Sequence, residues 1–214
     1  MPNHVTNRIE FKGDAKIIEN LLESLRGTEY PIWIDFNKIV PMPEGLDITC
    51  DGMVSLLDNQ FMVSLPITHL IERIKKADTE TIENFCKAIK NLNKYGKVSW
   101  HDWAITNWGT KWNAYNTKKV APNIIEFDTA WAGVPNLIAK ISEQFPQLEI
   151  EYKYADEDLG YNVGYIVFKN GNVDMEYYPE GGSNGAYQLA LELKPYANEY
   201  VKLVDGEYKY VEEA

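Results

Sequence analysis

The sequence has little of what most catalytic and metal-binding sites are built from. Its 214 residues include only two cysteines, Cys50 and Cys86, and three histidines, His4, His69 and His101. Two cysteines form neither a disulfide framework nor a zinc set, and no histidine pair has a metal-ligand spacing. No nucleophile elbow, phosphate-binding loop or dinucleotide fingerprint occurs. We therefore expect no metal, no cofactor and no catalytic residue, and we expect both cysteines to be buried.

Long apolar runs and excess positive charge are also missing. No apolar stretch approaches the roughly 20 residues that span a bilayer, and the N-terminus lacks the regions of a signal peptide. We therefore expect a cytoplasmic protein without a membrane partner. The 21 basic and 32 acidic residues give a net charge of −11, which argues against binding to the phosphate backbone of DNA or RNA.

The hydrophobic residues that are present suffice for one folded domain. They make up 45% of the chain, so their burial can offset the entropy lost on folding. We expect a single domain over residues 1–214. Its parts are a core of residues 1–43 and 120–158, a mainly helical insertion of residues 44–119, and a C-terminal extension of residues 159–214.

The predicted core contains the same strand–helix–strand pattern twice. In the first copy, residues 4–12 alternate between apolar and polar, a helix capped by Asp14 follows, and residues 32–40 form a second predicted strand. The Ile-Glu-Phe triplet at residues 9–11 recurs 116 residues later, at 125–127. Two such units predict an α+β, ferredoxin-like fold with a split βαβ sheet. The alternative is chance similarity between two amphipathic segments.

The insertion and the extension carry local signals of their own. Helical spacing of apolar residues predicts two helices between residues 67 and 92, separated at residues 78–79, and we expect them to cap the sheet. Asn170-Gly171, between two alternating runs, predicts a β-hairpin. A helix over residues 187–193 and a last strand near residues 206–211 complete the extension.

Charge is distributed unevenly along the chain. Residues 58–120 hold ten basic and six acidic side chains, whereas residues 148–214 hold five basic and fourteen acidic ones. Such asymmetry steers a small anion toward the insertion although the whole chain is acidic. For the lysines of residues 75–90 we prefer a simpler interpretation, an ordinary solvated helix face.

Tryptophan is concentrated in one polar stretch, residues 99–115, which holds four of the six. Indole rings offer rigid faces on which a base or a sugar can stack. Lys111, Thr110 and Asn113 are suited to hold phosphates or base edges. The alternative is that these tryptophans only fasten the insertion to the sheet. They are Trp100, Trp103, Trp108 and Trp112.

Two short motifs carry acid and base groups. The carboxylates at residues 156–158 can act as an acid–base pair, but we favour a charged turn between two strands. His101 and Asp102 can form a similar pair, but adjacent side chains on a strand point to opposite faces. We take neither motif as a catalytic site.

Several stretches of the sequence resemble the YubB ferredoxin-like family, small proteins carried by bacteriophages and plasmids. These stretches are residues 1–8, 107–113, 129–131 and 154–158, together with Gly160, Asn162 and Gly164. The resemblance covers residues 1 to about 40 and about 100 to 165. It implies a ferredoxin-like fold and an origin in a mobile genetic element, and it implies no catalytic residue.

The ferredoxin-like plan brings distant polar motifs to one end of the sheet. Its two central strands run parallel, and its outer strands run antiparallel to them. Four segments therefore meet at this end of the sheet. They are the start of the first strand, the segment before the third strand, the exit of the second strand at Asn37 and Lys38, and the exit of the fourth strand. The ligand-binding residues predicted on this basis are His4, Asn7, Trp108, Thr110, Lys111, Trp112, Asn113, Tyr115, Asp156 and Asn162.

These features predict a phage or mobile-element protein of the host cytoplasm. We expect it to counter host defence by sequestering a small anionic, nucleotide-type immune signal without turnover. One alternative is an acidic inhibitor that imitates a nucleic acid and occupies a host defence protein. Another is a nucleotide-processing enzyme with His4, His101 or Asp156 as acid or base. A homo-oligomer would bury an open edge of the sheet.

Overall fold

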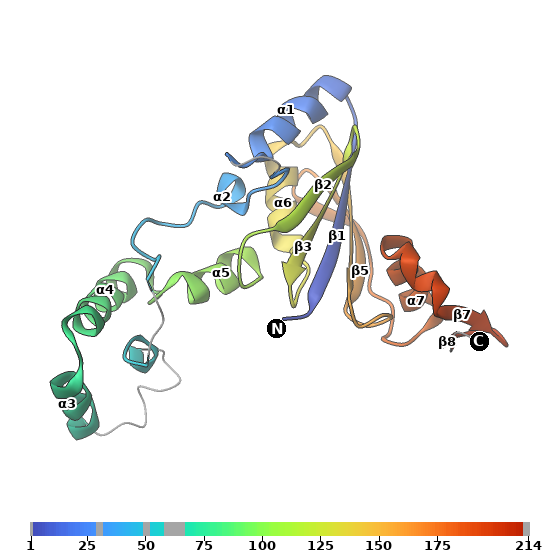
Figure 1. The fold of residues 1–214 in the computed structure, drawn as a ribbon. Helices are drawn as coiled ribbons and strands as arrows, with labels where there is room; N and C mark the ends of the chain where they lie inside the picture. Colours follow the sequence, from blue (N-terminus) through green and yellow to red (C-terminus); the bar gives the residue numbers. More distant parts are fainter. Residues whose placement is uncertain (1, 29–31, 49–51, 58–66, 212–214) are drawn as a thin grey trace. The chain divides into compact units, whose positions relative to one another are not determined.

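The computed structural model describes residues 2–28, 32–48, 52–57 and 67–211 (Figure 1). The chain divides into two compact units, which we call the sheet unit and the helical unit. The sheet unit comprises Met1–Pro41 and Trp108–Ala214, and the helical unit comprises Met42–Asn107.

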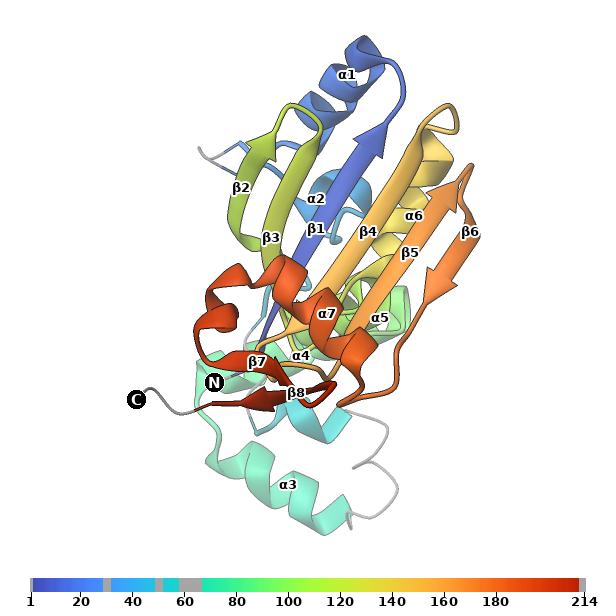
Figure 2. The same ribbon diagram turned by 90° about the vertical axis from the view of Figure 1, so that its right-hand side faces the viewer.

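Six strands form the sheet of the sheet unit. They are β1 (His4–Lys12), β2 (Tyr115–Ala121), β3 (Ile124–Ala130), β4 (Glu149–Asp156), β5 (Val163–Lys169) and β6 (Asn172–Tyr177). Their order is β2-β3-β1-β4-β5-β6, and all neighbours are antiparallel (Figure 2). β3, the helix α6 (Pro135–Gln144) and β4 form a βαβ unit, and β1 lies between its two strands. This arrangement confirms the predicted α+β fold with a split βαβ sheet.

Helices cover both faces of the sheet. α1 (Ala15–Leu25) and α6 lie on one face, and α7 (Asn184–Leu193) lies on the other (Figure 1). Alternate residues of β1 are fully buried, as the polar–apolar pattern predicts. The side chain of Asp14 accepts two backbone hydrogen bonds at the start of α1 and caps it as predicted.

Residues 32–40 do not form the predicted strand. They run as irregular chain into a short helix, α2 (Phe36–Ile39), which the side chain of Asp35 caps. Asn37 and Lys38 therefore lie in a helix and not, as expected, at the exit of a strand.

The missing strand has a physical reason. Asn113 Oδ1 accepts a hydrogen bond from the amide of Phe36, and Thr117 Oγ1 accepts one from the amide of Trp33. These side chains supply the acceptors that a neighbouring strand would have offered. The alternating apolar residues still serve the core, since Ile34 and Phe36 are fully buried.

The two copies of the duplicated pattern also pair differently from the prediction. Their first strands, β1 and β3, were expected to run parallel, but they are antiparallel, and Ile9 lies directly opposite Ile125. Consequently β1 begins beside the end of β3. The matched triplets are therefore cross-strand neighbours within one sheet.

The C-terminal extension contains the predicted elements. Asn170 and Gly171 connect β5 to β6 with φ angles of 50° and 74°, the left-handed conformation that a two-residue hairpin turn requires. After α7 come a short 3-10 helix, η2 (Pro195–Glu199), and the two-stranded sheet of β7 (Val201–Val204) and β8 (Glu207–Tyr210).

The described helices of the predicted insertion lie in the helical unit, whereas residues 115–119, expected to belong to the insertion, form part of β2 in the sheet unit. The described elements of the helical unit are η1 (Val54–Leu57), α3 (Ile67–Lys76), α4 (Thr79–Tyr95) and most of α5 (Trp100–Trp108). The side chain of Asp78 accepts a hydrogen bond from the amide of Thr81 and caps α4, which confirms the predicted break between two helices. None of the helices that the structure describes is long and apolar enough to cross a membrane.

The exposure of side chains on α3 and α4 tests the predictions for the lysines of residues 75–90 and for Cys86. The lysines of residues 75–90 are exposed, so the solvated-face interpretation is confirmed. Cys86 is exposed as well, contrary to the expectation of burial, because Phe85 and Ala88 form the buried face of α4. Cys50 lies outside the described residues.

Candidate functional site

Antiparallel pairing gathers several distant segments at one end of the sheet. His4 at the start of β1 lies opposite Ala130 at the end of β3, and Tyr115 at the start of β2 lies opposite Asp128. The convergence expected from the sequence is therefore present, although antiparallel neighbours produce it. We call the following residues the sheet-end cluster: Asn3, His4, Lys111, Trp112, Tyr115, Trp131, Asp156 and Asn162.

A lysine close to two indole rings is the main feature of this cluster. Nζ of Lys111 lies 4.9 Å from the ring centre of Trp112 and 5.2 Å from that of Trp131. Such cation–π contacts hold an ammonium group in place without neutralising its charge. In the described part of the chain, Lys111 forms no ion pair with a carboxylate. Its charge is therefore available to an anion.

Trp131 is held in an unusual conformation at the end of β3. Its φ angle is 65°, in the left-handed region, and its side chain is 49% exposed. A bulky residue in this region costs about 1 kcal/mol or more and persists only where the surroundings hold it. Here the Trp131 amide donates to the carbonyl of Asn3, and its carbonyl accepts from Asn162 Nδ2, both at 3.0 Å. The fold thus holds an indole ring toward solvent.

Asp156 is a buried residue whose carboxylate stabilises this end of the sheet through hydrogen bonds. The residue is 4% exposed. One carboxylate oxygen accepts hydrogen bonds from Asn3 Nδ2 and from the amide of Asp158, and the other accepts from Asn162 Nδ2. The carboxylate is therefore engaged on both oxygens. The residues that follow it, 157–158, form an exposed bend, so the charged-turn interpretation is confirmed.

His4 and Tyr115 form a second polar contact in the cluster. His4 Nδ1 lies 2.6 Å from the Tyr115 hydroxyl, which also donates to the carbonyl of Thr129. Burial raises the pKa of Tyr115 to about 12, and the carboxylates of Asp128 and Glu157 contribute to the shift. The phenol is therefore neutral at physiological pH and serves as a hydrogen-bonding group.

Three other predicted ligand-binding residues stabilise the fold. Trp108 is 2% exposed, and its Nε1 donates to the carbonyl of Val40. Thr110 is equally buried, and its hydroxyl bonds both the amide and the carbonyl of Ala130. Asn113 bonds the residues that begin α2. For Trp108 the structure thus favours the alternative of a fastening role, here within the sheet unit.

Asn7, also a predicted ligand-binding residue, is fully buried in the sheet. Its Oδ1 accepts a hydrogen bond from the Tyr152 hydroxyl at 2.6 Å, and its Nδ2 donates to Thr129 Oγ1 at 2.8 Å. The Tyr152 hydroxyl in turn accepts from the amide of Val134. Asn7 therefore joins β1, β3 and β4 and offers no polar group to a ligand.

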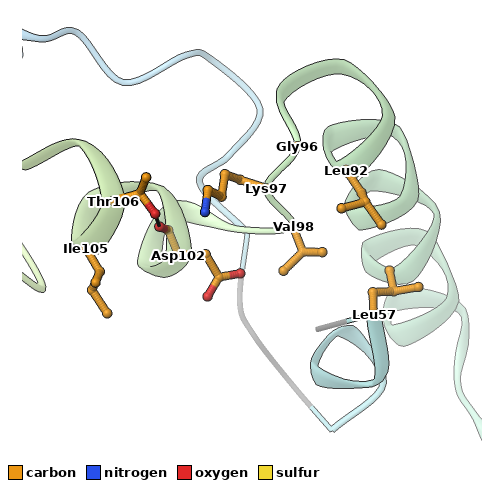
Figure 3. Close-up of a pocket in the computed structure, with 8 residues that line it drawn as sticks. All are labelled: Leu57, Leu92, Gly96, Lys97, Val98, Asp102, Ile105 and Thr106. Atoms are coloured by element: carbon orange, nitrogen blue, oxygen red, sulfur yellow. Dashed lines mark hydrogen bonds between the residues drawn. The ribbon is translucent and has the colours of Figure 1, made fainter. Parts of the chain in front are cut away.

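The remaining acid–base motif and two tryptophans, Trp100 and Trp103, belong to the helical unit. His101 Nδ1 lies 3.6 Å from Asp102 Oδ1, and the two residues lie in the first turn of α5 and not on a strand as expected. Asp102 lines a cavity of about 220 Å³, and the Lys97 side chain points toward it (Figure 3). Among the described residues, no group of three or more histidine, cysteine or acidic side chains is arranged to hold a metal ion.

A family model and a solved structure are similar to this chain. A family model described as the ferredoxin-like domain in Api92-like protein matches residues 107–197, from the end of α5 into η2. A solved structure, protein Api92 from Yersinia pseudotuberculosis, is similar with a TM-score of 0.45 and 13% identity, over 85% of this chain and 99% of that chain. No curated protein matches the chain. The family match, together with the split βαβ unit, confirms the predicted ferredoxin-like fold class.

Proposed function

We propose that this protein binds a small anionic, nucleotide-type molecule at the sheet-end cluster and sequesters it unchanged. The observation that carries the proposal is the exposed indole of Trp131, held in a strained conformation beside the ammonium group of Lys111. Strained, exposed residues are found disproportionately at binding sites, where the strain holds a side chain ready for its ligand.

The chemistry of the cluster fits the two parts of a nucleotide. A flat base stacks on an exposed indole such as Trp131 and gains about 1–3 kcal/mol. The Lys111 ammonium, free of ion pairs within the described chain, meets a phosphate group as a point charge. Trp112 supplies a second ring next to the same lysine. Base and phosphate are thereby contacted from adjacent positions.

Sequestration without turnover is supported by how the acid and base groups of the cluster are used. Asp156 is buried and hydrogen-bonded on both oxygens. Tyr115 keeps its proton, and Nδ1 of His4 contacts the Tyr115 hydroxyl. A general acid or base must have an atom within reach of the substrate. His4 is exposed, but its Nδ1 is engaged with Tyr115; the half-buried Lys111 and the exposed Trp131 bind and stack.

The proposed setting is a bacteriophage or plasmid protein in the host cytoplasm, where the ligand is a signal of host immunity. This part of the proposal depends on the sequence resemblance to the YubB family. A homo-oligomer belongs to the same proposal, because all six residues of the edge strand β6 are exposed and can be covered by a second copy.

A matched pair of lysine variants tests the site. Lys111→Met should weaken binding of the ligand about 10- to 100-fold, because it removes a hydrogen bond to a charged group. Lys119→Met is the control, since Lys119 Nζ also lies over an indole, at 5.5 Å from the ring centre of Trp33, but outside the cluster. We would measure both by calorimetry against a panel of linear, cyclic and ADP-ribose-derived nucleotides.

Two outcomes would count against the proposal. Equal affinities of Lys111→Met and Lys119→Met would remove the cluster as the binding site. A panel in which no nucleotide binds the wild-type protein would remove the nucleotide ligand itself. The second outcome would favour the acidic-inhibitor alternative, for which the exposed Glu157 and Asp158 are the candidate contacts.

A further inference from the structure

The sheet unit contains a larger cavity that the sequence did not reveal. It has a volume of about 640 Å³, and its lining residues place it on the face of the sheet that α7 covers. Its floor consists of residues from β1, β2 and β3, and its wall consists of the end of α7 and the start of η2. The volume falls within the range of small-molecule sites, which is about 300–1,000 Å³. No residue of the sheet-end cluster lines this cavity.

Lys194, in the wall of this cavity, is a buried cation with few partners. The residue is 4% exposed, and its Nζ donates one hydrogen bond, to Thr6 Oγ1 at 2.8 Å. An ammonium group has three donors. Within the described residues it forms no ion pair. A buried charge without a direct counter-charge is costly, which makes Lys194 the natural polar anchor for a ligand.

Two of the carboxylates near Lys194 are already engaged. Asp128 accepts hydrogen bonds from Thr6 and Asn116, and Asp156 is used within the sheet-end cluster. These two carboxylates and that of Glu157 act on Lys194 from a distance and raise its pKa, but burial outweighs them and the pKa is lowered. Among the described residues, no carboxylate pairs directly with the Lys194 ammonium, so the negative group of a ligand can take that position.

The charge of the lining limits what the cavity can hold. Arg8 and Lys118 both form ion pairs with Glu126, at 2.6 Å and 3.0 Å, so these three groups together carry one positive charge. Lys194 adds a positive charge, and Asp128 adds a negative one. The lining therefore has a net charge of +1, which a single negative charge on a ligand neutralises.

We propose that this cavity binds a small amphipathic monoanion, a carboxylate with an aromatic or aliphatic body, whose carboxylate pairs with the Lys194 ammonium. The apolar body lies against Val120 and Tyr196, two cavity-lining side chains that are 47% and 58% exposed. A phosphate monoester fits less well, because its second negative charge faces Asp128 and the more distant carboxylates of Asp156 and Glu157. The site uses other residues than the sheet-end cluster and does not depend on the proposed nucleotide binding.

The test uses three probes that share a naphthalene body and carry headgroups of different charge. 1-Naphthoate is a monoanion, 1-naphthamide is its neutral analogue, and 1-naphthyl phosphate is largely a dianion at pH 7.5 or above. Calorimetric titration of the full-length protein should show 1-naphthoate binding about tenfold or more tightly than either of the others. Equal affinity for the acid and the amide, or no binding of 1-naphthoate at about 1 mM, would overturn the proposal.

Variants then locate the probe. Lys194→Met should reduce the affinity for 1-naphthoate to that for the amide, while Lys169→Met, which removes a lysine on the β5–β6 hairpin, should leave it unchanged within about twofold. Tyr196→Ser changes an exposed side chain and provides a second variant that does not disturb the core. It should weaken binding of the acid and the amide alike. If Lys194→Met or Tyr196→Ser binds 1-naphthoate as tightly as the wild-type protein, this cavity is not the site.

Discussion

Replacing Trp131 by glycine should weaken nucleotide binding about 10- to 100-fold without destabilising the fold. The substitution removes the stacking surface, which is worth about 1–3 kcal/mol, so affinity should fall about 10- to 100-fold. Glycine adopts the φ of 65° at this position without steric cost. The relief of strain offsets the lost contact with Lys111, which is worth about 0.5–1 kcal/mol. A substitution that impairs function while preserving stability marks a residue placed for its ligand.

Trp131→Ala provides the matched control for this prediction. Alanine also lacks the indole, but its Cβ keeps the left-handed backbone strained. The free energy of unfolding in urea should therefore be about 1 kcal/mol higher for Trp131→Gly than for Trp131→Ala, while both bind the ligand equally weakly. If either variant keeps wild-type affinity within about twofold, Trp131 has no part in binding.

Replacing Asn7 by alanine should have the opposite effect, a large loss of stability. Asn7 Oδ1 accepts from the buried Tyr152 hydroxyl, and its Nδ2 donates to Thr129 Oγ1 and to a β3 carbonyl. Alanine leaves these buried groups without their partner, which should cost about 2–4 kcal/mol. The thermal midpoint should fall by about 5–15 °C in a calorimetric scan.

The double variant Asn7→Ala/Tyr152→Phe controls for this interpretation. Because Tyr152→Phe removes the hydroxyl that Asn7 leaves unpaired, the double variant should lose less stability than the sum of the single variants. Asn7→Ala should still bind ligand wherever it remains folded. An Asn7→Ala variant with an unchanged midpoint but no binding would instead support the ligand contact that the sequence predicts for Asn7.

Local signals in the sequence predict local structure well. The cap at Asp14, the helix break at Asp78 and the hairpin at residues 170–171 depend on contacts between residues close in sequence. The strand predicted at residues 32–40 fails for the opposite reason. Its backbone amides donate hydrogen bonds to the side chains of Asn113 and Thr117, about 80 positions away. No local sequence pattern indicates such contacts.

The sequence predicts where the candidate site lies, but not which of its side chains are exposed. The polar motifs meet at one end of the sheet in any fold that places the start of β1 beside the ends of β3 and β4. This prediction is therefore correct although the predicted direction of the strands is wrong. Which side chains face outward depends on register and burial, and Asn7, Trp108 and Thr110 turned out to be buried. Trp131 was visible only as part of the family-like motif at residues 129–131, since its backbone conformation leaves no trace in composition.

The larger cavity could not be predicted from the sequence, because the burial of Lys194 has no local sequence signal. A lysine at the end of an amphipathic helix is usually a solvated residue, and nothing in residues 184–199 indicates otherwise. Its burial results from η2 following α7 over the face of β1 and β3, where Thr6 accepts the hydrogen bond of the ammonium. A buried cation of this kind is a consequence of tertiary structure.

The most direct test of nucleotide binding at the sheet-end cluster follows the indole N–H signals of the tryptophans by NMR while the nucleotide panel is added. If the sheet-end cluster binds the ligand, at least one nucleotide should shift the signals of Trp131 and Trp112, which adjoin Lys111, and leave those of Trp33 and Trp108 in place. Assignment by single Trp→Phe variants identifies each signal. If every nucleotide leaves Trp131 unshifted, or if Trp33 shifts as much as Trp131, the sheet-end cluster is not the binding site.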